Sequence, residues 1–265
     1  MKPAAFVALL AVSLMAPMHL SNADSAIEIE DIETSVTGLD TVIVKAILAR
    51  PSSNARHDET SKRRPLVVLL HDYARESDTL IPLSDELVKA GFAALRIDMR
   101  GHGQSIRREV GGSHLAAMVE SNDFGKSTVD VRRFLESLRS DSRINSTRVV
   151  VLGFGVAGYV AVEVAALEPD VAGVVLVDPP GVRGDFSPGR ELSILDLRPA
   201  LFVTSSLPGA REQAESLAKY GPGERVIKQF ESYDGGDRMM IPGSAPLSET
   251  AGWIERLLTP TVEPE

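Results

Sequence analysis

The stretch VVVLGFGVAG, residues 149–158, is typical of a buried strand that enters a glycine-rich turn and then a helix. A turn of this kind can hold one side chain above the end of a sheet, where a serine hydroxyl would act as a nucleophile. The middle of the turn is Gly155, and small residues stand around it at Gly153, Ala157 and Gly158. The sequence therefore predicts a tight strand–turn–helix connection with no side chain at its centre.

A serine nucleophile also needs a base, and the histidines of this chain lie in its first half. They are His19, His57, His71, His102 and His114. No histidine follows residue 114, so the turn at 149–158 has none downstream of it. The chain has no cysteine, which excludes a thiolate nucleophile, a disulfide and a cysteine metal site.

Several acidic residues follow expected strands, namely Asp72, Glu231, Asp234 and Asp237. If they gather at one edge of a sheet, they could bind a cation or supply general acids and bases. The competing interpretation is that these loops are acidic for solubility. The segment GVAG lacks the lysine and the spacing of a phosphate-binding loop. We therefore predict no metal ion and no cofactor.

Alternating strands and helices must position these residues. Apolar runs and period-two alternation predict strands near 40–51, 65–72, 92–98, 148–155, 171–180, 200–205 and 224–231. Helical spacing predicts helices near 80–92, 124–140, 156–169, 209–221 and 248–259. Residues 106–122 read as irregular. This order predicts an α/β domain with a mostly parallel sheet and helices on both faces, with no large lid between 179 and 198.

Composition limits the classes of partner. The chain has 265 residues, 43% hydrophobic and 25% charged, which suits one soluble globular domain. Its formal net charge is −9, so nucleic acid and anionic membranes are poor partners.

The first 23 residues resemble a secretory signal peptide. Lys2 precedes an apolar run, and Ser21-Asn22-Ala23 is spaced for cleavage. An uncleaved N-terminal anchor is the alternative. With the signal removed, the protein would be periplasmic or secreted without a membrane span. We expect a leader at 24–39, the folded domain at 40–258 and a tail at 259–265.

Three signatures occur in order: LVVLLHDY (66–73), IDMRGHGQS (97–105) and VLGFGVAG (151–158). Together they resemble the α/β-hydrolase superfamily, in particular its single-domain esterases, lipases and peptidases. The resemblance covers roughly residues 40–258 and implies the α/β-hydrolase fold. It also implies structural roles for His71 and His102, as residues that orient loops through hydrogen bonds.

The resemblance implies positions for a Ser, an acid and a His, and all three are replaced. The nucleophile position is Gly155, the acid position is Pro208 and the histidine position is Gly235. Asp178 is a possible alternative acid, although capping of a turn also explains it. The oxyanion donors would be the amide of Val156 and one in the loop after His71, where Asp72 replaces the usual glycine.

We expect an exported protein that does not catalyse and that binds a small molecule or a protein partner. The alternative is an ester or peptide hydrolase with an unusual constellation, in which Asp178 or the acids at 231–237 activate water. The loss of three side chains should leave a cavity above Gly155 that favours a neutral or cationic ligand. Its expected lining is Asp72, Tyr73, Val156, Leu207, Tyr233, Asp234 and Asp237.

Overall fold

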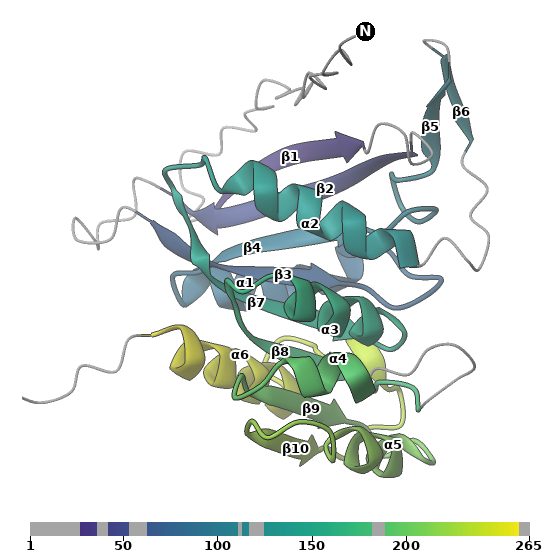
Figure 1. Cartoon of the computed structure of the whole chain (residues 1–265), viewed down its shortest axis with the longest axis vertical. Helices are drawn as coiled ribbons and strands as arrows, with labels where there is room; N and C mark the ends of the chain where they lie inside the picture. Colours follow the sequence, from purple (N-terminus) through teal and green to yellow (C-terminus); the bar gives the residue numbers. More distant parts are fainter. Residues whose placement is uncertain are drawn as a thin grey trace, which may run out of the picture.

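One sheet organises the molecule. The structure is a computed structural model that describes residues 27–35, 42–52, 63–110, 113–116, 125–181 and 189–259. Within these ranges ten strands form a single sheet (Figure 1). Its parallel part has the order β10 (Arg225–Gln229), β9 (Ala200–Thr204), β8 (Val171–Val177), β7 (Ile144–Phe154), β3 (Arg64–Leu70) and β4 (Ala93–Asp98). The predicted α/β-hydrolase architecture is confirmed.

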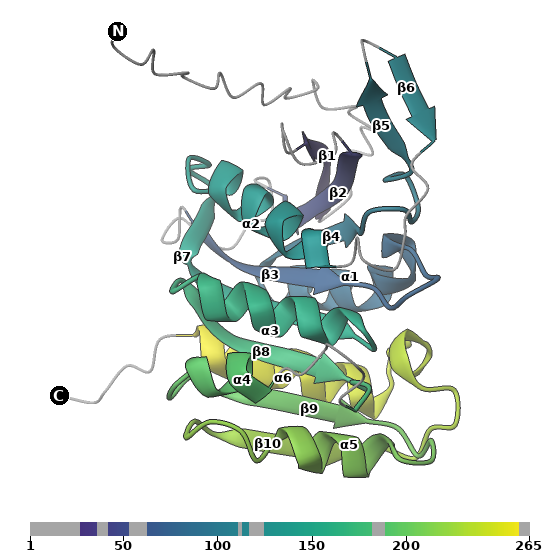
Figure 2. The same cartoon turned by 45° about the vertical axis from the view of Figure 1, so that its right-hand side comes forward.

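Helices cover both faces of the sheet. On one face pack α2 (Ser127–Leu138), α3 (Ala157–Leu167), α4 (Gly189–Ile194) and α5 (Ala210–Leu217). On the other pack α1 (Ile81–Lys89) and α6 (Ala245–Leu258), and Figures 1 and 2 show α2 and α3 in front of the sheet with α6 behind it. The continuous apolar run of β3 follows from this arrangement. Leu66, Val68 and Leu70 enter the first core, whereas Val67 and Leu69 enter the second.

Part of the expected leader belongs to the sheet. Ile27–Ser35 forms β1, which pairs antiparallel with β2 (Val42–Pro51) over nine residues. Arg50 forms ion pairs with Glu28 at 2.9 Å and Glu30 at 3.0 Å. The boundary at residue 40 is therefore corrected, because the alternation IEIE is a strand pattern with acidic partners for a basic residue on the neighbouring strand. The expected signal at 1–23 and residues 260–265 of the tail lie outside the described residues.

A second correction concerns residues 106–122. Arg107–Val110 and Ser113–Ala116 form β5 and β6, an antiparallel hairpin, and β5 also pairs with β2. The described residues also include the short 3₁₀ turns η1 (Ser77–Leu80) and η3 (Gly236–Met239). None of the described helices is long and apolar enough to cross a membrane.

The parallel strands end at one edge of the sheet, where the site residues lie. His71 and Asp72 follow β3, Gly155 follows β7, Asp178 follows β8, and η3 comes after β10. In Figure 2 the arrowheads of β8 and β9 point to this side. The carboxyl edge of an open α/β sheet is where such folds bind ligands.

Candidate functional site at the carboxyl edge of the sheet

The turn between β7 and α3 keeps the geometry of a nucleophile-bearing turn. Gly155 has φ +51°, and its amide donates to the carbonyl of Val177 at 2.8 Å. A Cβ at Gly153 would lie closer than 3.0 Å to the backbone of Ala157 and Gly158, so close strand–helix packing requires glycine there. At residue 155 the positive φ is accommodated by glycine, which presents no side chain above the turn.

The carboxyl group of Asp72 occupies the space above Gly155. Its Oδ1 accepts hydrogen bonds from the amides of Tyr73 at 2.7 Å and Val156 at 3.1 Å. A Cβ at Gly155 would lie closer than 3.0 Å to all three atoms of this carboxyl group. The open cavity expected directly above Gly155 is therefore wrong, because Asp72 fills the space that a missing side chain leaves.

Two opposing effects act on the ionisation of Asp72. Burial raises the pKa of its carboxyl group, and the negative charge of Asp237 raises it further. The amides of Tyr73 and Val156 and the charge of Arg75 lower the pKa, but the net direction is upward. Arg75 is itself held by Asp237 through an ion pair of 2.6 Å between Nη2 and Oδ2. This ion pair joins the loop after β3 to η3.

His71 and His102 tie the loops of this edge together. The Nε2 atom of His71 accepts from the amide of Met99 at 3.0 Å, so its Nδ1 donates to the carbonyl of Asp72 at 2.8 Å. Burial lowers the pKa of His71 to about 4, which keeps the ring neutral. His102 accepts from the amide of Ala74 at 3.2 Å and contacts the carbonyl of Arg100. These contacts match the structural roles expected for both histidines.

Asp98 shapes the loop of the second signature. Its Oδ1 accepts from the amide of Ser77 at 2.8 Å, and its Oδ2 accepts from that of Gln104 at 2.9 Å. Ser105 donates its hydroxyl to the Asp98 carbonyl at 2.5 Å. A Cβ at Gly103 would collide with the Asp98 carboxyl group, which explains the glycine. The signature is thus a folded loop whose acid already has backbone partners.

Asp178 lies beside the position implied for the histidine. Its Oδ1 accepts from the amide and the hydroxyl of Ser205 at 2.7 and 3.0 Å, and its Oδ2 accepts from the amide of Gly236 at 2.7 Å. A Cβ at Gly235 would lie 3.2 Å from Asp178 Oδ2 and 2.5 Å from Leu207 Cδ1. Asp178 thus connects the ends of β8 and β9 to η3. Pro208 is exposed in the loop after β9.

The remaining residues expected to line a cavity are spread around the edge. Tyr73 is exposed and its ring packs edge-on against His102, with centroids 5.4 Å apart. Tyr233 is 81% exposed and therefore does not form an enclosing aromatic wall. Leu207 and Asp234 are also exposed, whereas Asp237 is partly buried in its ion pair with Arg75.

The sequence reasoning missed two residues of this edge. Arg75 and Ser205 hold Asp237 and Asp178, and neither stands in a motif that marks it. One signal for the Asp72 contact was present. Position 72, where the resemblance implies a glycine, has the larger side chain of Asp72, whereas position 155, where it implies a serine, has only glycine. Side-chain volume gained at one position is thus matched by volume lost at the other.

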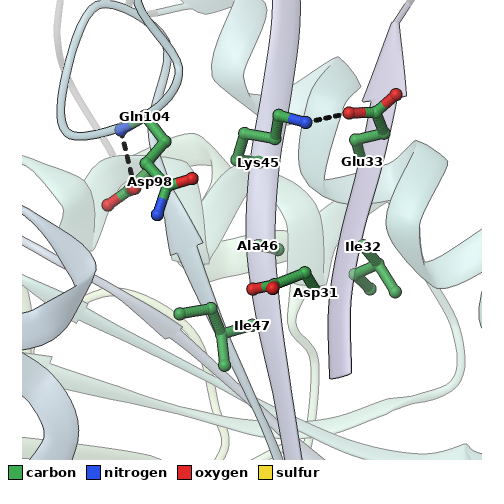
Figure 3. Close-up of a pocket in the computed structure, with 8 residues that line it drawn as sticks. All are labelled: Asp31, Ile32, Glu33, Lys45, Ala46, Ile47, Asp98 and Gln104. Carbon is green, nitrogen blue, oxygen red and sulfur yellow. Dashed lines mark hydrogen bonds and ion pairs between the residues drawn. The ribbon is translucent and has the colours of Figure 1, made fainter. Parts of the chain in front are cut away.

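A hollow among the described residues lies elsewhere, between β1, β2 and the end of β4. It measures about 160 Å³ and is shown in Figure 3. Lys45 points toward Glu33, with which it forms an ion pair, and Asp98 is bonded to Gln104. In the described ranges, no three His, Asp or Glu side chains come together so that they could hold a metal ion.

Comparisons with known structures agree on the fold. The structure of DcsB with its substrate analogue has a TM-score of 0.67 at 14% identity, over 88% of this chain and 100% of that chain. An esterase from an Arctic intertidal metagenomic library has a TM-score of 0.65 at 14% identity, covering 92% and 100%. Dienelactone hydrolase from Anabaena variabilis has a TM-score of 0.61 at 17% identity, covering 88% and 97%.

The family assignment comes from the sequence. No curated protein matches the chain. The profile of the family described as serine aminopeptidase, S33, matches residues 61–218, which is more than half of the chain and includes β3, β4, β7 and the turn at Gly155. The chain therefore belongs to the serine aminopeptidase S33 family of the α/β-hydrolase superfamily.

Proposed function

We propose that this protein is a non-catalytic member of its family that binds a small molecule or a protein partner at the carboxyl edge of its sheet. One observation carries the proposal. The two amides that would stabilise an oxyanion, those of Tyr73 and Val156, hold the chain's own Asp72 carboxyl group above a turn without a nucleophile.

The negative charge of Asp72 argues against acyl transfer at this edge. An acyl-transfer transition state places negative charge on an oxygen at these amides. A carboxylate that already occupies them excludes that oxygen and repels its charge. The same charge supports a neutral or cationic ligand over an anionic one.

A second candidate is hydrolysis by acidic groups in place of a serine. The raised pKa of Asp72 favours it, because a carboxyl group shifted upward by burial is suited to general acid–base work. Against it stands the occupation of the Tyr73 and Val156 amides by Asp72, which leaves neither of them free for the developing charge.

One experiment separates the two candidates. The purified chain is assayed against short-chain p-nitrophenyl esters and aminoacyl p-nitroanilides, and small neutral, cationic and anionic compounds are tested in parallel by thermal shift. Binding of a neutral or cationic compound without turnover supports the proposal. Turnover that Asp72→Asn abolishes would establish the second candidate instead.

A further inference from the structure

The position of Asp72 determines which ligands this edge admits. Its Oδ1 is bonded to two amides from different elements, Tyr73 in the loop after β3 and Val156 at the start of α3. Two convergent backbone donors form an anion-binding geometry. The occupant of that geometry is a carboxylate, supplied by the chain itself.

We propose that Asp72 is the specificity-determining residue of this edge, an internal ligand that occupies the amides of Tyr73 and Val156 and keeps carboxylate ligands out. The inference rests on the proposed function in taking this edge to be a binding site. It goes further by naming carboxylates as the class of ligand that is excluded and Asp72 as the side chain that excludes them.

The absence of a side chain at residue 155 makes this contact possible. A Cβ there would overlap the Asp72 carboxyl group, so Asp72 occupies the amides only in a chain with Gly155. The elbow conformation at φ +51° is retained, and with it the direction of the Val156 amide. The replacement at 155 and the acid at 72 therefore act together as one feature of the site.

The residues around Asp72 fix the position of its loop, and they also raise the pKa of its carboxyl group. Its loop is fixed at three points: by His71, whose ring bonds the Asp72 carbonyl, by His102, which accepts from Ala74, and by the ion pair of Arg75 with Asp237. The charged groups that face the carboxyl group are Asp237 from η3 and Arg75 from its own loop. Burial and Asp237 raise the pKa of Asp72, so the neutral form, which binds the amides less strongly, is reached more readily on acidification.

Acetate is the probe for an external carboxylate. The amide resonances of Tyr73 and Val156 are followed by ¹H–¹⁵N NMR while acetate is added at neutral pH to the wild type, Asp72→Ala and Glu255→Ala. Glu255 is an exposed acid of α6 and controls for the loss of one negative charge. We expect Asp72→Ala to bind acetate at least about tenfold more tightly than the wild type, because the charge-assisted bonds become available to it. Glu255→Ala should behave as the wild type.

Equal acetate affinity in the wild type and Asp72→Ala would overturn the inference, as would acetate binding in Asp72→Ala without any shift of the two amides. If Asp72→Ala fails to fold, the wild type is titrated with acid instead. The Tyr73 and Val156 amides should then shift together with a midpoint above the ordinary pKa of aspartate, and Asp72→Asn should lose that step. Two amides that do not respond to this ionisation would equally refute it. Ester turnover in the wild type together with acetate binding by Asp72→Ala would contradict only the proposed function.

Discussion

The carboxyl group of Asp72 lies where the side chain of residue 155 would begin, although 83 positions separate the two residues. A side chain at residue 155 and the observed placement of the Asp72 carboxyl group exclude each other. Glycine at 155 provides both the positive φ and the free volume, and Asp72 uses that volume to reach the Val156 amide. The two residues should therefore be coupled energetically.

The coupling can be measured by adding a methyl group at residue 155. Gly236 is a matched control, since it has φ +54° and nothing within 4 Å of its Cβ direction. Gly236→Ala should destabilise the protein by about 1 kcal/mol, the penalty for a left-handed conformation. Gly155→Ala should destabilise it by about 3 kcal/mol, because overlap with Asp72 is added to that penalty. Urea unfolding monitored by circular dichroism gives both values.

Removal of Asp72 should relieve the added penalty. In an Asp72→Gly background, Gly155→Ala should destabilise the protein only about as much as Gly236→Ala, which gives an interaction energy of about 2 kcal/mol between the two positions. Identical effects of Gly155→Ala in both backgrounds would show that Asp72 yields without strain, and the coupling would be refuted.

The sequence predicted the fold because its signals are local. The continuous apolar runs of β3 and β7 and the turn at Gly155 depend on neighbours within a few residues. The segment at 27–35 carried the period-two signal as well, but its acidic side chains find partners in Arg50 on β2 and in Arg143, the residue just before β7. Those partners become apparent only once the strands are paired.

The candidate site was less predictable because it depends on contacts between distant loops. The sequence placed Asp72, Val156 and Asp237 at one edge, and the structure places them there. It did not indicate that Asp72 would turn onto the Val156 amide, or that Arg75 would neutralise Asp237. Side-chain direction of this kind follows from the surroundings of a residue in three dimensions.

His71 should make stability depend on pH. Its folded-state pKa is lowered to about 4, so the unfolded chain binds more protons than the folded protein between about 6.5 and 4. The free energy of unfolding should fall by up to roughly 3 kcal/mol as the pH drops through that window. His71→Gln keeps a donor and an acceptor without a titrating ring, so its loss of stability over the same window should be smaller.

Chemical unfolding at several pH values between 7 and 4 provides the test. Asp72 acts in the opposite direction, since its raised pKa makes its protonation favour the folded state as the pH falls. Both proteins contain Asp72, so subtracting the free energy of unfolding of His71→Gln from that of the wild type at each pH removes the contribution of Asp72. Parallel pH curves for the two proteins would mean that His71 does not carry the effect.

Export is expected from the first 23 residues. Lys2, the apolar run and Ser21-Asn22-Ala23 together predict cleavage before Asp24. Intact-mass determination of the protein from its own host should give a chain that starts at Asp24, in a periplasmic or culture fraction. A chain that begins at Met1 and stays in the cytoplasmic fraction would contradict the expectation.

Asp178 should be able to act as the acid of a rebuilt triad. Asp72→Gly frees the two amides, and Gly155→Ser supplies a hydroxyl. Gly235→His places a ring near Asp178, because a Cβ at 235 lies 3.2 Å from Asp178 Oδ2. Leu207→Ala removes the Cδ1 atom that lies 2.5 Å from that Cβ. The variant with all four changes should hydrolyse p-nitrophenyl acetate at least about 100-fold faster than the wild type, because a base and an oriented nucleophile are restored.

The acid is tested within the rebuilt variant itself. Adding Asp178→Asn should lower its kcat at least about tenfold, since the imidazolium that forms loses its charged partner. Asp178 binds the amide of Ser205 through Oδ1 and that of Gly236 through Oδ2, and asparagine has only one acceptor oxygen, so the melting temperature should fall. The two kcat values are therefore compared at a temperature well below both melting temperatures. Unchanged turnover of the folded Asp178→Asn variant would show that Asp178 only fastens the loops. The hydrogen bonds to Ser205 and Gly236 would then be its whole role.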